Sequence, residues 1–204
     1  MNDLDRALGD ISSIRRQVAQ STEFRGYGPA TLAATGMLAL GAALFQTWLI
    51  PNPAASLSRY LALWIATAAI SATVTAVQMH TRSRRMHSGL SDEMIRMAVE
   101  QFLPAIGSGL LLTIVVVLSQ PALAWLLPGL WQVIFGLGIF SSCRFLPRSI
   151  FVCGVWYLLT GLVVIGLGSE RALSPWCMGI SFAVGQLLSA AILFRAAKEY
   201  AVER

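Results

Sequence analysis

The sequence has 204 residues, of which 56% are hydrophobic and only 12% are charged. Soluble domains usually carry about 25% charged residues, so this chain has too few charges to cover a surface that faces water. The length allows one domain of ordinary size. The composition therefore excludes a water-soluble domain and predicts a protein whose solvent is lipid.

The basic excess indicates contact with lipid rather than with nucleic acid. The formal net charge is +5, and arginine supplies nearly all of the positive charge, with Lys198 as the single lysine. The arginines stand at the ends of apolar runs, where such residues set membrane orientation and contact anionic headgroups. We therefore expect membrane lipids as partners and no nucleic acid.

The first 24 residues form a separate segment. They are polar and charged and lack the apolar core of a cleavable signal peptide, so we expect the first membrane helix to serve as an uncleaved signal. Leu4, Ile11 and Val18 recur at every seventh residue, which predicts an amphipathic helix over residues 1–24. Such a helix lies at the membrane interface or docks on a partner, either another protein or a second copy of this chain.

Six apolar stretches follow in residues 25–204, each close to the roughly 20 residues with which an α-helix crosses a bilayer. The predicted fold is therefore all-α, with six transmembrane helices behind the N-terminal amphipathic helix. Only a very short turn separates the third stretch from the fourth, which predicts a tight antiparallel hairpin. The predicted spans are about 29–50, 60–79, 98–119, 122–143, 149–168 and 173–194.

The basic residues divide unevenly between the two sides of this arrangement. Thirteen lie on one side and two, Arg59 and Arg171, on the other. Cytoplasmic segments carry the excess of lysine and arginine, so both termini are expected in the cytoplasm. An odd number of spans would mix the two groups. The thirteen are Arg6, Arg15, Arg16, Arg25, Arg82, Arg84, Arg85, Arg96, Arg144, Arg148, Arg195, Lys198 and Arg204.

An internal repeat of three helical hairpins is a further prediction. The first, third and fifth spans each open with a phenylalanine before a proline, and the second, fourth and sixth each carry a tryptophan: Trp64, Trp125 and Trp176. Because proline suits a helix start and tryptophan suits a membrane interface, chance convergence is the alternative explanation.

A glycine-rich boundary, EFRGYGP over residues 23–29, precedes the first span and includes Arg25. Glycine and proline predict a sharp turn, which is either a structural elbow or a hinge that couples the N-terminal helix to the bundle. Residues 11–36 resemble an uncharacterised bacterial six-helix inner-membrane protein family. The resemblance implies a multi-pass protein of the bacterial inner (plasma) membrane and brings no known activity.

Glu100 is the carboxylate most favourably placed for a function. Arg96 precedes it by four residues, so the two lie on one helical face. At membrane depth Glu100 would carry a proton or bind a substrate, with Gln101 beside it. At headgroup depth it would pair with Arg96. The segment from Ser91 is typical of a capped helix that runs on into the membrane, which favours the pairing.

Four spans hold one glutamine each: Gln46, Gln78, Gln132 and Gln186. Buried amides bond across membrane helices, each worth roughly 0.6–2 kcal/mol. Gln132 and Gln186 are the deeper pair and line either a polar cavity or, more commonly, a cohesive contact. Ridges of small residues in spans one, two and six predict close helix packing, either within the core or in a homodimer. They run over residues 31–47, 62–73 and 181–189.

Two repeated pairs, Met79-His80 and Met86-His87, are weak candidates for a metal site, since both side-chain types bind copper or haem iron. The arginines between them oppose a cation, which favours solvated histidines. Cys143, Cys153 and Cys177 form no metal-binding or disulfide pattern. We expect no cofactor.

No hydrolase, zinc-protease or phosphate-loop motif is present, so we expect no catalytic residue, and an enzyme is the least favoured reading. The first hypothesis is a membrane-embedded regulatory, sensor or assembly protein that acts through its cytoplasmic face. The second is a small-solute transporter or channel subunit. The third is a lipid-modifying enzyme that uses Glu100 and arginines of the inner headgroup layer, with Arg144 and Arg148 in the short turn between spans four and five.

Overall fold

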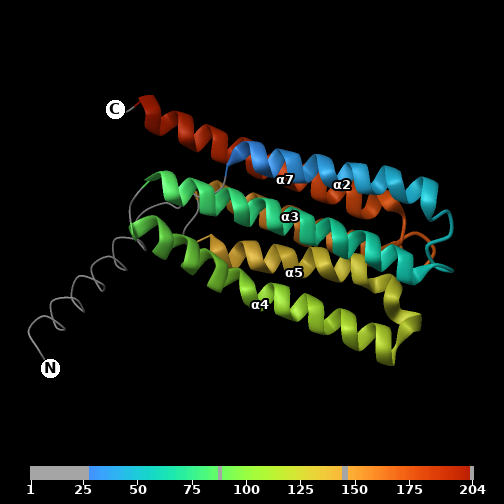
Figure 1. Cartoon of the computed structure of the whole chain (residues 1–204). Coiled ribbons are helices and arrows are strands. Elements are labelled where there is room, and N and C mark those ends of the chain that lie inside the picture. Colours follow the sequence, from blue (N-terminus) through green and yellow to red (C-terminus); the bar gives the residue numbers. More distant parts are fainter. Residues whose placement is uncertain (1–27, 87–88, 144–146, 203–204) are drawn as a thin grey trace, which may run out of the picture.

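The computed structural model describes residues 28–86, 89–143 and 147–202, and within these ranges it contains helices and turns but no strands. Six helices are long and apolar enough to cross a membrane, which confirms the predicted all-α fold (Figure 1). They contain α2 (Pro29–Leu49), α3 (Leu57–Met86), α4 (Gly89–Ser119), α5 (Leu127–Ser142), α6 (Phe151–Gly166) and α7 (Pro175–Val202). The spans that contain α5 and α6 begin earlier, at Pro121 and Arg148, because each includes the short 3-10 helix that precedes it. The amphipathic helix predicted for residues 1–24 lies outside the described residues.

Prolines set several of the helix boundaries. Pro29 and Pro175 are the first residues of α2 and α7, a position where the missing N–H loses no hydrogen bond. Pro121 begins a 3-10 helix, η1 (Pro121–Leu126), that leads into α5. A second 3-10 helix, η2 (Arg148–Ile150), leads into α6. In contrast, α4 contains Pro104 within its length and continues through it.

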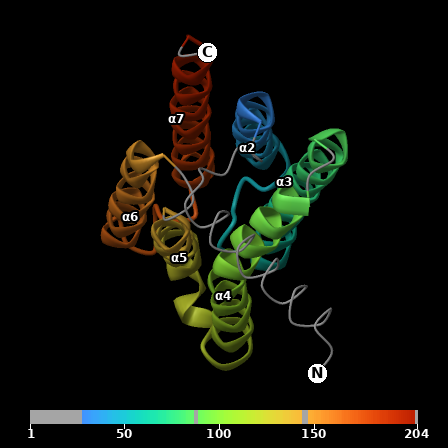
Figure 2. The same ribbon diagram turned by 90° about the vertical axis from the view of Figure 1, so that its left-hand side faces the viewer.

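Two helix pairs make the most extensive contacts, α2 with α7 and α5 with α6 (Figure 2). In both pairs glycine lets the backbones approach closely. A Cβ placed on Gly129 of α5 would stand 2.6 Å from the carbonyl oxygen of Gly161 on α6, and the reverse placement gives the same distance. Gly136 and Gly154 repeat this arrangement further along, with 2.9 Å from a Cβ on Gly136 to the Gly154 oxygen. The first and last spans are thus packed together, as are the fourth and fifth.

Helices α3 and α4 lie at the periphery. In the apolar stretch of α3 only 22% of the residues are buried, and in that of α4 only 11%. The corresponding share is 44% in the stretches that contain α5 and α7. In Figure 1 the two helices diverge from the end of α3 and the start of α4. Few contacts join α3 directly to α4. Both helices therefore present most of their apolar surface outward, as is expected of helices in lipid.

The predicted hairpin of spans three and four is present, with Gln120 alone between α4 and η1. The consecutive pairs α2–α3, α4–α5 and α6–α7 all make contact. The largest contacts nevertheless join helices of different pairs, so the packing does not follow the predicted hairpins. The threefold repeat stays a prediction.

The two ends of the bundle differ. The end that we call arginine-rich is formed by residues 78–86, 89–100, 143 and 147–148, together with the start of α2 and the end of α7 (Figure 1). The opposite end holds the turns at 50–56, 120 and 167–174. An even number of antiparallel helices places residue 28 and the end of α7 at the same end.

Candidate functional site

Two fully buried glutamines hold the segment that leads into α7. Gln46 of α2 donates from Nε2 to the backbone carbonyl of Leu173 at 2.9 Å, and its Oε1 accepts a hydrogen bond from Trp64 Nε1 at 2.8 Å. Gln132 of α5 donates from Nε2 to the carbonyl of Cys177 at 3.0 Å. Both glutamines are 0% exposed. The contacts tie α2, α3 and α5 to the beginning of α7.

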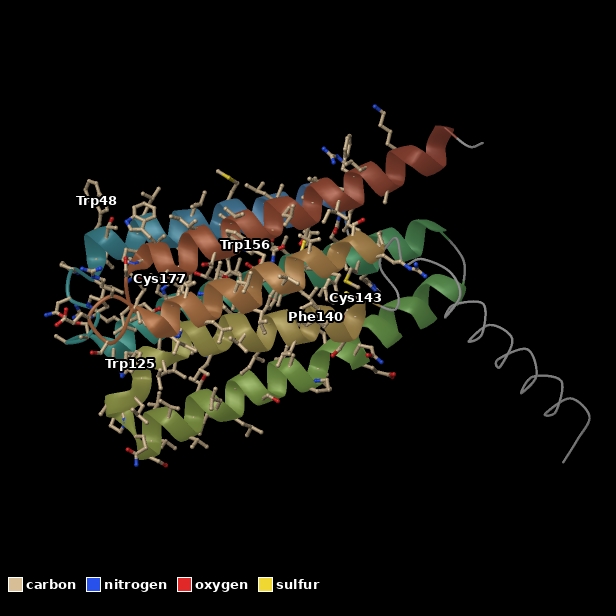
Figure 3. The ribbon with its side chains drawn as sticks, turned by 180° about the vertical axis from the view of Figure 1, so that it is seen from behind. Trp48, Trp125, Phe140, Cys143, Trp156 and Cys177 are labelled. Carbon is tan, nitrogen blue, oxygen red and sulfur yellow. The ribbon has the colours of Figure 1, made fainter. Side chains whose placement is uncertain are left out.

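This polar cluster lies toward the opposite end of the bundle. Figure 3 shows Cys177 toward the same end as Trp48 and Trp125, whereas Cys143 lies toward the other. Of the three tryptophans that suggested a repeat, Trp64 is buried and serves as a hydrogen-bond donor to the core. Its role is therefore internal cohesion rather than anchoring at the membrane interface.

Gln78 has a different role, at the arginine-rich end. Its Oε1 accepts a hydrogen bond from the backbone N–H of Gly28 at 3.1 Å, so α3 holds the residue at which α2 begins. A Cβ on Gly28 would collide with the Gln78 side-chain amide. Gly28, in the described part of the glycine-rich boundary predicted as an elbow or hinge, is thus bonded to α3. Sequence reasoning treated Gln78 as general cohesion and missed this contact.

Gln186, the other deep glutamine, is half-buried on α7 and packs toward Gly36 of α2. Among the described residues no hydrogen bond joins Gln186 to Gln132 or to another helix. The predicted pair therefore does not act as one polar unit. Gln132 instead holds two helices together, which is the more common use of a buried glutamine in a membrane protein.

The small-residue ridges of the sequence divide into two classes. Those of α2 and α7 are buried at their centres, at Thr35, Ala39 and Ala43 and at Ser181, Gly185 and Ser189. A Cβ on Gly179 would collide with Ala43, which shows how closely α2 and α7 approach. The α3 ridge is exposed along its length, at Ala62, Ala66, Ala69 and Thr73. The internal core therefore accounts for two of the three ridges.

The candidates at the arginine-rich end are spread over several elements. Glu100 of α4 is exposed, and Gln101 beside it is half-buried. Arg148 is exposed at the start of η2. The side chain of Arg96 is not among those described, so its pairing with Glu100 stays a prediction. Arg25 and Arg144 lie outside the described residues.

The Met-His candidates do not share one environment. Met79 is buried, whereas His80 next to it is exposed. His87 lies outside the described residues, and the side chain of Met86 is not described. Within the part of the chain whose side chains are described, no three His, Cys, Asp or Glu residues gather as metal ligands.

Comparisons with family models, with curated proteins and with solved structures find no match to this chain. Its function is therefore inferred from its own residues and contacts.

Proposed function

We propose that this protein is a membrane-embedded regulatory, sensor or assembly protein of the bacterial inner membrane, acting through a cytoplasmic arginine-rich end. The observation that carries the proposal is an asymmetry of the helices. At the arginine-rich end α3, α4 and α7 remain helical over residues 82–86, 89–99 and 197–202, where charged and polar residues interrupt the apolar sequence. At the opposite end short turns over residues 50–56, 120 and 167–174 connect the helices.

The charge of these extensions supports the proposal. The first two carry Arg82, Arg84, Arg85 and Arg96 on segments that are helical but not apolar enough to belong to the membrane. Basic residues next to a membrane helix favour the cytoplasmic side and bind anionic headgroups or acidic protein surfaces. Within the described ranges, the helical extensions beyond the apolar sequence are thus available to a partner on one side.

The interior of the bundle offers less support for the two alternatives. The charged residues of the six spans, Arg59, Glu100, Arg148 and Arg195, all stand near an end of the apolar stretch to which they belong. Ion-coupled transporters usually carry titratable groups deeper in the membrane. A lipid-modifying enzyme would need Glu100 in a pocket with other groups, and its side chain is exposed.

A topology experiment tests the sidedness on which the proposal depends. Ser149 and Ser169 are both exposed and lie just outside the two ends of α6. In a chain without its native cysteines, a membrane-impermeant maleimide should label Ser169→Cys in spheroplasts that still have an intact inner membrane. Ser149→Cys should react only after the membrane is opened. The reverse pattern would place the arginine-rich end outside the cytoplasm and overturn the proposal.

A second experiment tests the role of the extensions. Cross-linking in native membranes, followed by mass spectrometry, would compare the full chain with Arg82→Gln/Arg84→Gln/Arg85→Gln and with a chain that lacks residues 1–22. The control, Arg59→Gln/Arg171→Gln, neutralises the opposite end. We expect the first two variants, but not the control, to lose specific cross-linked proteins or anionic lipids. A set of cross-links unchanged in every variant would refute the regulatory assignment.

A further inference from the structure

Two buried polar atoms have no hydrogen-bond partner in the described part of the chain, the hydroxyl of Tyr60 and the side-chain carbonyl oxygen of Gln132. Both residues are 0% exposed. Buried polar groups are almost always hydrogen-bonded to protein or to ordered water, because leaving one unpaired is costly. Two such atoms within a single bundle therefore call for a common explanation.

Both residues converge on the first turn of α7. The Gln132 Nε2 group donates to the Cys177 carbonyl at 3.0 Å and lies 3.7 Å from Met178 Sδ. Met178 also belongs to the buried cluster that contains Tyr60 and Leu127. Tyr60 of α3 and Gln132 of α5 are therefore both contributed to the region beside the first turn of α7.

The orientation of the Gln132 amide follows from its neighbours. Its NH2 group faces two acceptors, the Cys177 carbonyl and the Met178 sulfur. Rotating the amide by 180° would place its carbonyl oxygen against the Cys177 carbonyl oxygen, and two acceptors repel each other. Gln132 Oε1 must therefore face away from Cys177 and requires a donor from elsewhere.

The chemistry of the two atoms selects a small neutral occupant. A cation would need about six oxygen ligands and usually a carboxylate, whereas this region supplies two neutral oxygens. A larger organic ligand would need several directing groups and a pocket of a few hundred cubic ångströms, about 300 Å³ or more. Water donates to a carbonyl and exchanges hydrogen bonds with a phenol, and buried waters typically serve otherwise unsatisfied groups.

We propose that Tyr60 and Gln132 form a buried binding site for one internal water molecule, which bridges the Tyr60 hydroxyl and the Gln132 carbonyl oxygen. The site links α3 to α5 next to the first turn of α7. Water-mediated contacts are nearly as favourable as direct hydrogen bonds, so the bridge fastens the peripheral helix α3 to the core.

X-ray radiolytic footprinting of the full chain in lipid nanodiscs tests the proposal, because an internal water generates hydroxyl radicals beside the residues that surround it. Met178 is only 4% exposed and should nevertheless be oxidised. We expect its oxidation to fall several-fold in Tyr60→Phe and in Gln132→Leu, and to be unchanged in the control Gln186→Leu. Equal oxidation of Met178 in all four proteins would overturn the proposal.

Thermal unfolding provides an independent sign. If water pairs the hydroxyl, Tyr60→Phe lowers the unfolding midpoint, and combining it with Gln132→Leu lowers the midpoint by less than the sum of the single effects. A midpoint raised by Tyr60→Phe would mean an unpaired hydroxyl and refute the site. If the double variant again loses less than the sum of the single effects but Met178 is not oxidised, the two side chains share a direct hydrogen bond. That outcome also refutes the water site. If Gln132→Leu fails to fold, Tyr60→Phe alone tests the water site, because this variant keeps the aromatic ring and removes only the hydroxyl.

Discussion

Replacing Gly161 with alanine should loosen the α5–α6 pair, and the structure sets the size of the effect. A Cβ at Gly161 would stand 2.6 Å from the carbonyl oxygen of Gly129 and 3.0 Å from the backbone nitrogen of Val133. Carbon–oxygen contacts between helices lie near 3.3–3.6 Å, so the two backbones must separate by about 0.7 Å or more. Overpacking costs about 1–3 kcal/mol, and a backbone obstacle yields less than a side chain does. The upper half of that range, about 2–3 kcal/mol, less the helix preference of alanine, about 0.5–1 kcal/mol, leaves a net loss of about 1–2.5 kcal/mol.

The free energy of unfolding can be measured by titrating the protein with sodium dodecyl sulfate in mixed micelles and following its tryptophan fluorescence. Gly109→Ala is the matched control, because a Cβ at Gly109 of α4 would meet nothing within 4 Å. The control should be neutral or more stable by up to about 1 kcal/mol. Adding Gly129→Ala to Gly161→Ala should cost less than the sum, since separation of the helices relieves both contacts. Equal stability of Gly161→Ala and Gly109→Ala would refute the close backbone packing.

Three further predictions use the same titration. Gln46→Leu leaves a buried carbonyl and the Trp64 indole N–H without partners and should cost about 1–3 kcal/mol; a loss below about 0.5 kcal/mol would contradict the observed bonds. Gln78→Leu should cost about 1 kcal/mol and speed amide hydrogen exchange at the start of α2, and unchanged exchange would show that this bond does not hold the junction. Ala43→Leu should destabilise the protein by about 1–3 kcal/mol. Ala69→Leu, on the exposed ridge, should change its stability by less than about 0.5 kcal/mol. A large loss of stability in Ala69→Leu would indicate that a partner helix covers α3.

The six membrane helices could be predicted from the sequence because hydropathy and proline act locally. The first span, for example, was placed over about 29–50, and α2 runs from Pro29 to Leu49. The ends of helices outside the membrane could not be predicted in the same way. The second span was expected over about 60–79, whereas α3 extends from Leu57 to Met86. Helical hydrogen bonds continue into water without an apolar signal, so hydropathy marks the membrane segment and not the end of the helix.

The contacts of the glutamines could not be predicted in this way. The sequence shows that Gln46 stands in an apolar run, but its partner Leu173 lies 127 residues away. Which carbonyl an amide reaches depends on the packing of α2 against α7. For α5 and α6 a signal was present and went unused: Gly129 and Gly136 are seven residues apart, as are Gly154 and Gly161. Small residues at this spacing lie on one helical face and are typical of close-packed membrane helices.

The two hydrogen bonds that attach α3 to the bundle indicate which contact a partner bound to residues 82–86 would affect first. Near the opposite end Trp64 fastens α3 to the buried Gln46, and near the arginine-rich end Gln78 fastens it to Gly28. Between these points α3 is largely exposed. Residues 82–86 begin one turn beyond Gln78 on the same rigid helix. A partner that displaces this extension therefore acts on the Gly28–Gln78 bond before it reaches the glycine-packed core. Since Gly28 is also where the N-terminal segment joins the bundle, this bond is where the proposed cytoplasmic activity would be coupled to the membrane domain.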